Sequence, residues 1–163
     1  MATSELEQAA IARTGMLVRK PVAEVFEAFV DPAITSQFWF THGSARLAAG
    51  QRVTWSWEMF GASAEVLVTE LERDRRIAIE WDGYTGRTRV EWKFAALPEG
   101  TFVSVAESGW TGDAEQLIGY VADSTAGFTW MLAGLKAFLE HGVRLNLVAD
   151  RFPRGPQDPY PTA

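Results

Sequence analysis

The chain contains no cysteine, which excludes disulfides, thiolate metal ligands and a cysteine nucleophile. Histidine occurs only at His42 and His141, and neither has a second histidine or a carboxylate at the spacing of a zinc site. The sequence also lacks a Gly-rich phosphate loop, a nucleophile elbow and an HExxH motif. We therefore expect no metal and no cofactor, and whether the protein is an enzyme stays open.

Positive charge and long apolar runs are also scarce. The formal net charge is −6, which disfavours nucleic acids and anionic membrane surfaces as partners, because both bind clustered Lys and Arg. No run approaches the roughly 20 apolar residues of a membrane span. The first residues are acidic where a signal peptide needs basic ones. These features predict a soluble, cytoplasmic protein with no membrane partner.

Hydrophobic residues make up 47% of the 163 residues, which is sufficient for one domain. We expect this domain over residues 12–150, after a flexible polar lead-in at 1–11. Residues 151–163 are expected to form an irregular proline-rich tail, with four prolines after Phe152. Residues 143–148 alternate weakly and are compatible with a last strand or a coil.

The first part of the domain predicts a strand followed by two short helices. The strand covers residues 13–19 and ends before Pro21, which suits the start of a helix over 21–30. Asp31 and Pro32 then predict a second short helix through Gln37.

From residue 44 the apolar residues recur every second position, which is typical of half-buried antiparallel strands. Five successive strands are expected, and the side chains predicted to face inward are Val53, Trp55, Trp57, Met59, Val66, Val68, Ile77, Ile79, Trp81, Val90, Trp92, Phe94, Val103, Val105 and Glu107. In the second of these strands Leu67 and Leu71 compete with the valines, and we favour the valine face. The strands together predict an antiparallel meander.

Residues 113–142 give the longest helical pattern, with Asp113 and Gln116 suited to a capping box and Gly142 to a stop. One face of this helix is apolar apart from Tyr120 and Ser124: Leu117, Tyr120, Val121, Ser124, Phe128, Met131, Leu132, Leu135, Phe138 and Leu139. The residues placed on the opposite face are Ala126, Thr129, Lys136 and Glu140. A helix of this kind against an aromatic sheet can enclose a pocket.

Three polar residues are candidates for that pocket. Glu107 is expected inside, either as a ligand-binding or catalytic carboxylate, or near the mouth with water or a neighbouring Lys or Arg. Tyr120 and Ser124 lie one helical turn apart, so their hydroxyls either converge on one ligand or serve locally. In the local alternative, the Tyr120 hydroxyl meets water and Ser124 bonds to the Tyr120 carbonyl.

The seven tryptophans either fill the core or line a ligand site. The four on the strands are Trp55, Trp57, Trp81 and Trp92. Trp130 falls on the outer flank of the long helix near Asp123, where it either packs under the C-terminal tail or contributes to a homodimer contact.

Several segments together match a known family pattern: residues 19–26 with Asp31-Pro32, the cluster Phe38-Trp39-Phe40, the turn at 47–50, residues 77–81, and Gly127-Phe128 with Leu132, Leu135, Lys136, Leu139 and Glu140. In these segments the chain resembles the START-like, or SRPBCC, superfamily, in particular the branch of the activator of the heat-shock protein 90 ATPase. The resemblance implies an α+β helix-grip fold, in which a curved antiparallel sheet wraps a long C-terminal helix. It also implies that Trp39 and Phe40 lie near the mouth of a cavity.

Relatives in this superfamily include lipid carriers, cyclases, receptors and chaperone regulators, so the resemblance leaves function open. The leading hypothesis is binding of a small hydrophobic or aromatic molecule between the sheet and the long helix. The residues expected to contact it are Trp39, Trp55, Trp57, Trp81, Trp92, Glu107, Tyr120, Ser124 and Phe128. The alternatives are a cyclase- or hydrolase-like enzyme that uses Glu107, and a chaperone co-regulator that acts through its outer surface.

Overall fold

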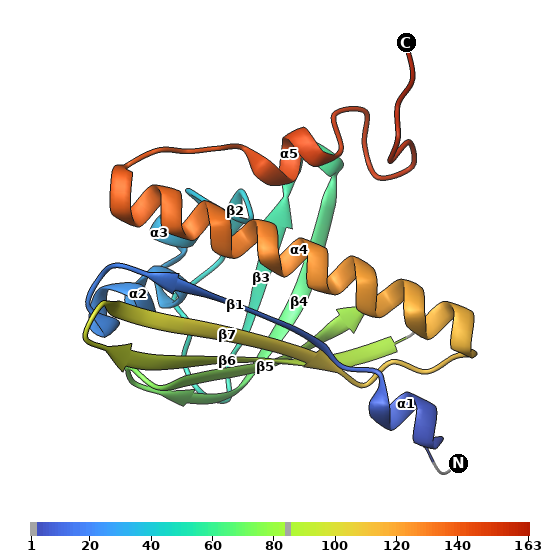
Figure 1. The fold of residues 1–163 in the computed structure, drawn as a ribbon, viewed down its shortest axis with the longest axis horizontal. Coiled ribbons are helices and arrows are strands. Elements are labelled where there is room, and N and C mark those ends of the chain that lie inside the picture. The colour runs from blue at the N-terminus through green and yellow to red at the C-terminus, as the bar shows by residue number, and fades with distance from the viewer. Residues whose placement is uncertain (1–2, 84–85) are drawn as a thin grey trace.

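The computed structural model describes residues 3–83 and 86–163 and consists of one curved sheet with a long helix across its inner face (Figure 1). The seven strands are β1 (Ala12–Val18), β2 (His42–Gly43), β3 (Arg52–Trp57), β4 (Ala62–Glu72), β5 (Arg76–Gly83), β6 (Gly86–Leu97) and β7 (Gly100–Ser108). Their order is β1-β7-β6-β5-β4-β3-β2, and each neighbouring pair is antiparallel. The predicted α+β helix-grip fold and its five-strand meander are confirmed.

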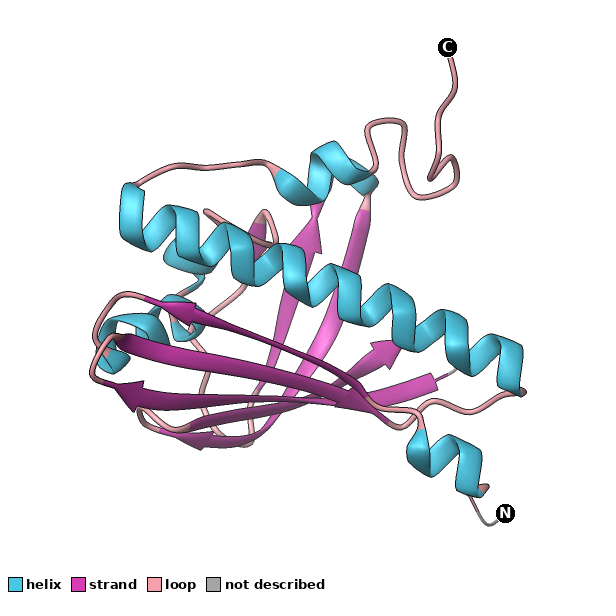
Figure 2. Cartoon of the chain, viewed as in Figure 1, coloured by secondary structure: helices cyan, strands magenta, loops and turns pink. Residues whose placement is uncertain are grey.

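Helices cover one face and the ends of this sheet, as the colouring in Figure 2 shows. They are α1 (Glu5–Ala9), α2 (Val22–Val30), α3 (Pro32–Thr35), the 3-10 turn η1 (Glu58–Phe60), α4 (Ala114–His141) and α5 (Leu147–Arg151). The two short helices after the first strand therefore form as predicted. The helix α1 lies within the expected lead-in, and Ser4 and Glu7 form its capping box.

The long helix α4 begins and ends where the sequence predicts. Asp113 and Gln116 form the capping box, and Gly142 ends the helix with a φ of 65°, a conformation that glycine adopts without strain. The middle of the helix buries four large apolar side chains against the sheet: Phe128, Met131, Leu132 and Leu135. Each such side chain contributes about 1.5–3 kcal/mol by leaving water, so this stripe holds the helix on the sheet.

The prediction that Thr129, Lys136 and Glu140 lie opposite the packed face is wrong. The Thr129 hydroxyl lies 2.7 Å from the Thr14 hydroxyl of β1, and Lys136 Nζ donates to the Leu17 carbonyl at 3.0 Å. Glu140 accepts a 3.0 Å hydrogen bond from the Arg19 backbone N–H. These polar side chains therefore lie along β1, because the outer edge of that strand offers unpaired main-chain groups.

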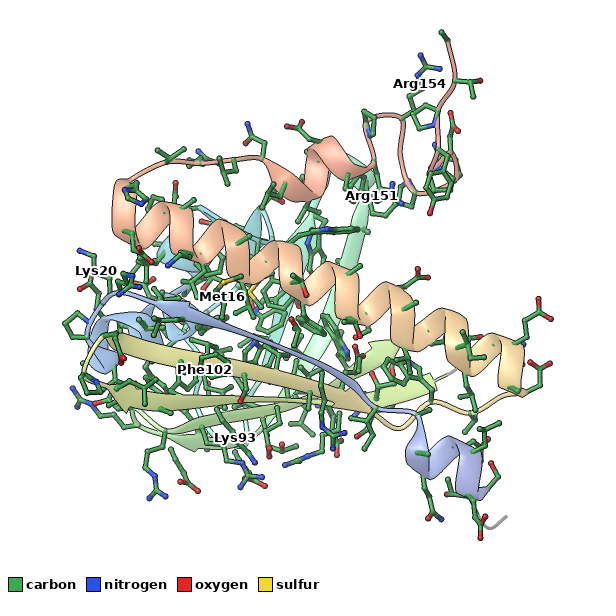
Figure 3. The ribbon with its side chains drawn as sticks, in the orientation of Figure 1. Met16, Lys20, Lys93, Phe102, Arg151 and Arg154 are labelled. Carbon is green, nitrogen blue, oxygen red and sulfur yellow. The ribbon has the colours of Figure 1, made fainter. Side chains whose placement is uncertain are left out.

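The inner face of the sheet follows the predicted alternation with one exception. Val66 and Val68 are fully buried, so the valine face of β4 is confirmed. The prediction that Met59 faces inward from a strand is wrong. The strand β3 ends at Trp57, and Met59 lies in η1 with 43% of its surface exposed. The opposite face of the sheet is polar, with Lys93 and the partly exposed Phe102 away from α4 (Figure 3).

The C-terminal segment runs back along α4 instead of adding a strand. Residues 142–146 are irregular, and α5 follows at Leu147–Arg151, which neither alternative for this segment anticipated. Within residues 3–83 and 86–163, no helix combines the length and the apolar character needed to cross a bilayer.

Candidate functional site

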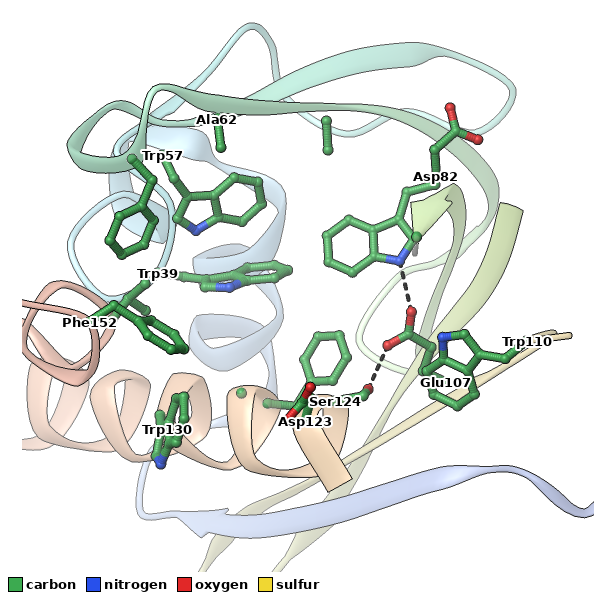
Figure 4. Close-up of a pocket in the computed structure, with 17 residues that line it drawn as sticks. Trp39, Trp57, Ala62, Asp82, Glu107, Trp110, Asp123, Ser124, Trp130 and Phe152 are labelled. Atoms are coloured by element: carbon green, nitrogen blue, oxygen red, sulfur yellow. Dashed lines mark hydrogen bonds between the residues drawn. The ribbon is translucent and has the colours of Figure 1, made fainter. Parts of the chain in front are cut away.

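A pocket of about 510 Å³ lies between the inner face of the sheet and α4 (Figure 4). Its volume falls within the range of small-molecule sites. Six of the nine predicted ligand-contacting residues line it: Trp39, Trp57, Trp81, Glu107, Ser124 and Phe128. Strand alternation predicted three of these six residues, one helix face predicted two, and the family resemblance predicted Trp39.

Glu107 is the central polar group of this pocket. It is 5% exposed and points inward from β7. Its Oε1 accepts hydrogen bonds from the Trp81 indole N–H at 3.0 Å and the Thr88 hydroxyl at 2.7 Å. Its Oε2 accepts a 2.5 Å hydrogen bond from the Ser124 hydroxyl of α4. One carboxylate thus joins β5, β6, β7 and the long helix.

The Glu107 carboxylate is buried, and its donors among the described residues are two hydroxyls and an indole. This is not the pairing with a Lys or Arg of a neighbouring strand that one alternative specified. Neutral donors satisfy a carboxylate's acceptor capacity without cancelling its charge. The negative charge of Glu107 therefore faces the pocket.

The structure brings Ser124 to the pocket but places Tyr120 elsewhere. The Tyr120 ring stacks on Trp110 with ring centres 6.5 Å apart, in a second apolar cluster with Ala10, Ala12 and Leu117. Tyr120 is not among the described residues that line the pocket. Ser124 donates to Glu107 and not to the Tyr120 carbonyl that the local alternative specified.

The strand tryptophans divide between core and pocket. Trp55 and Trp92 are 3% and 1% exposed, and neither is among the described pocket-lining residues. Trp92 packs against Phe29 and Phe128, with ring centres 6.0 and 5.9 Å away. The Trp39 ring contacts both of these indoles and separates them from the pocket. Trp55 and Trp92 therefore belong to the core.

The C-terminal segment forms the other end of the pocket. Phe152 packs edge-on against Trp130 with ring centres 6.3 Å apart, and Val148 of α5 also lines the pocket. The Arg151 guanidinium lies 5.5 Å from the centre of the Trp130 ring and 4.9 Å from that of Tyr160. Trp130 thus packs under the C-terminal segment, as one of its two alternatives predicted.

Four aromatic lining residues were missed from the sequence: Phe60, Trp110, Trp130 and Phe152. Phe60 lies in η1, and Trp110 follows the end of β7, so neither belongs to a periodic pattern. Phe152 lies where prolines predicted an irregular tail. The sequence does contain many aromatic residues outside the strands, and these could have been considered as pocket residues. An argument from apolar periodicity does not take them into account.

The charged groups at the pocket all have the same sign. Besides Glu107, the lining includes Asp82 and Asp123, both exposed and therefore at its rim. No Lys, Arg or His is among the described lining residues. The described part of the chain also holds no group of three His, Asp or Glu side chains that could bind a metal ion.

Residues 19–140 match the model of the activator of Hsp90 ATPase homolog 1-like protein family. The chain belongs to this family. The match covers most of the sheet and nearly all of α4, and it confirms the resemblance found in the sequence. A search of curated proteins gave no significant match.

Several solved structures share the fold of this chain. The protein SSP2350 from Staphylococcus saprophyticus is 33% identical, with a TM-score of 0.71 over 83% of this chain and 95% of that one. DynU16, a protein of the dynemicin biosynthetic locus, is 26% identical, with a TM-score of 0.73 over 83% of this chain and 49% of that one. The Aha1 dimer from Colwellia psychrerythraea is 16% identical with a TM-score of 0.70, covering 81% of this chain and 97% of that one, and shows the shared fold alone.

Proposed function

We propose that this member of the family binds a small hydrophobic or aromatic molecule in the pocket between the sheet and α4. The observation that carries the proposal is a 510 Å³ pocket with five of the seven tryptophans in its lining and one buried carboxylate. Ligand sites typically combine apolar walls with a few fixed polar groups that orient the ligand. Here the walls are indole and phenyl rings, and Glu107 with Ser124 supplies the polar point.

The aromatic walls are fixed by contacts among themselves. Trp39 lies within 5.0–6.1 Å, between ring centres, of Trp55, Trp57 and Trp81. Trp81 is stacked on Phe128 at 6.2 Å and is also held by its hydrogen bond to Glu107. Rigid rings lose little conformational entropy when a ligand binds, which favours affinity.

Gly127 provides a direct test, because it lines the pocket and has nothing within 4 Å of the position that a Cβ would take. In Gly127→Leu the new side chain occupies pocket space, while replacing a helical glycine stabilises α4 by about 0.5–1 kcal/mol. Gly119→Leu is the matched control, since Gly119 is on the same helix with the same open surroundings but does not line the pocket.

The experiment follows tryptophan fluorescence of both variants and the unchanged protein with a panel of uncharged polycyclic aromatics and fatty alcohols. We expect binding by the unchanged protein and Gly119→Leu, and at least tenfold weaker binding by Gly127→Leu at equal or higher thermal stability. Binding that Gly127→Leu leaves intact would place the ligand outside this pocket, and no binding across the panel would remove the proposal.

A cyclase- or hydrolase-like reaction at Glu107 has less support. The Glu107 carboxylate accepts hydrogen bonds from Trp81, Thr88 and Ser124, and none of these three residues is a second acid or base that could complete an acid–base pair. If Glu107 is catalytic, Glu107→Gln abolishes turnover and leaves ligand affinity nearly unchanged. If it orients a ligand, the same change lowers affinity alone.

A chaperone partner is the third candidate, and the family description names an Hsp90 ATPase activator. The surface that the sequence offered for a partner contains Trp130, which the structure places under Phe152 and Arg151. A pull-down in which Trp130→Ala loses a chaperone that the unchanged protein retains would favour this candidate over ligand binding.

A further inference from the structure

The charge of the pocket limits the kind of ligand that it can take. Asp82, Glu107 and Asp123 are the charged residues of the described lining, and all three are acidic. Arg87, outside the lining, pairs with Asp82, so Glu107 and Asp123 give the pocket its negative charge. A carboxylate or phosphate ligand would therefore enter without an ion-pair partner. A positively charged ligand would meet attraction at the rim and at the base.

Glu107 makes the strongest contribution because it is buried. Its three hydrogen-bond donors carry no formal charge, and among the described residues no Lys, Arg or His forms an ion pair with it. A buried carboxylate without a cation has lost much of its hydration, and a bound cation recovers part of that loss. Coulomb attraction is also stronger in such a site than in water.

Two arginines lie close to the pocket, but both are held by other groups. Arg87 Nε lies 3.5 Å from Asp82 Oδ1 on the exposed surface, and Arg87 also faces Glu80. Arg151 lies over the outer rings of the C-terminal segment and donates to the Pro159 carbonyl at 2.7 Å. Neither arginine is among the lining residues, so neither supplies a cation to the interior.

The aromatic walls favour the same sign of charge. The face of an indole ring attracts a cation, most strongly where water is excluded. Trp39, Trp57 and Trp81 line the same pocket as Glu107, and the Trp81 indole N–H donates a hydrogen bond to the Glu107 carboxylate. A cationic group near Glu107 therefore has indole rings beside it and a carboxylate in front of it.

We infer that the ligand is an organic cation: a flat apolar or aromatic body that carries a protonated amine or an ammonium group. This inference rests on the proposed function, since it specifies the charge of the molecule that the pocket binds. In the bound state the amine lies at Glu107 and the apolar body lies among the rings.

The test uses three probes with the same aromatic body: 2-(1-naphthyl)ethylamine, 2-(1-naphthyl)ethanol and 1-naphthylacetate. Isothermal titration calorimetry at neutral pH and low salt gives a Kd for each. We expect the amine to bind at least about tenfold more tightly than the alcohol, and the carboxylate to bind most weakly, because only the ammonium group is attracted as a cation to Glu107 and to the ring faces.

Two variants with the same change in net charge locate the effect. Glu107→Gln keeps the side-chain shape, and we expect it to bring the amine and the alcohol within about threefold of each other. Glu99→Gln is the control, because Glu99 is exposed in the turn before β7, at the other end of the strand. It should leave the preference for the amine unchanged.

The outcomes separate the two proposals. Equal binding of all three probes to the unchanged protein would overturn the inference about charge and retain the pocket as a ligand site. The inference about charge also fails, with the pocket again retained, if Glu107→Gln keeps the full preference for the amine. If no probe binds at millimolar concentration, both this inference and the proposed aromatic-ligand site fail.

Discussion

Removing the Glu107 carboxylate should loosen the attachment of α4 to the sheet. In Glu107→Leu the Thr88 hydroxyl, which is 2% exposed, loses its acceptor in a site closed to water, at a cost of about 1–3 kcal/mol. The Trp81 indole and the Ser124 hydroxyl also lose their acceptor, but both line the pocket, where water can replace part of the loss. Against this, the variant no longer buries a charge.

Together these effects predict a loss of about 2–4 kcal/mol in the free energy of unfolding, and a melting temperature lower by roughly 6–12 °C. Glu107→Gln should lose about 1 kcal/mol or less. Its amide oxygen can still accept from Trp81 and Thr88, and its amide nitrogen can donate to the Ser124 hydroxyl.

Urea unfolding followed by far-ultraviolet circular dichroism measures both variants without relying on tryptophan emission. If the slope of the unfolding free energy against urea concentration is unchanged, the variants differ in stability and not in the surface that unfolding exposes. The reasoning is refuted if Glu107→Leu is as stable as the unchanged protein, or if Glu107→Gln loses as much as Glu107→Leu.

Two further predictions concern groups outside the pocket. Burial raises the pKa of Glu140, but hydrogen bonds from Lys136 and the Arg19 N–H outweigh burial and lower that pKa below its ordinary value of 4.5. The stabilisation from the Glu140 carboxylate is therefore complete above pH 4.5 and is lost as the pH falls through the lowered pKa. The unchanged protein should be more stable than Glu140→Gln by a constant amount from about pH 5 to 7, and this difference should vanish at lower pH. A difference that persists in acid would contradict the lowered pKa of Glu140. Arg151→Ala removes the guanidinium contacts to the Trp130, Phe152 and Tyr160 rings. Hydrogen exchange at residues 152–158 should then accelerate at least about tenfold, while exchange in α4 stays unchanged. Unaltered protection at 152–158 would show that the guanidinium does not hold the C-terminal segment.

Local rules in the sequence were sufficient for most helices and strands and for the inward position of Glu107, while the resemblance to a known family supplied the helix-grip arrangement. Strand alternation is a property of neighbouring residues, so it placed Glu107 inside without knowledge of the sheet. The ends of α4 were predictable for the same reason, since Asp113 and Gly142 act on adjacent main-chain groups.

Residues whose position depends on where two elements cross could not be predicted. Tyr120 shares a helix face with Ser124, but its ring stacks on Trp110 in the second apolar cluster and is not among the described residues that line the pocket. Lys136 and Glu140 are polar, which suggested solvent, whereas β1 needed polar partners. Trp110 and Phe152 line the pocket, but both follow turns whose direction has no periodic signature in the sequence. The sequence alone therefore could not place them there.

The polar stripe of α4 also bears on how copies of this protein can assemble. Lys136 and Glu140 occupy a carbonyl and an N–H at one margin of the sheet, and the strand at the other margin, His42–Gly43, is only two residues long. Aggregation or pairing through strand addition requires a row of free main-chain groups. In the described chain neither edge strand offers a long row of free main-chain groups. Self-association would therefore have to proceed through side-chain surfaces and not by extending the sheet.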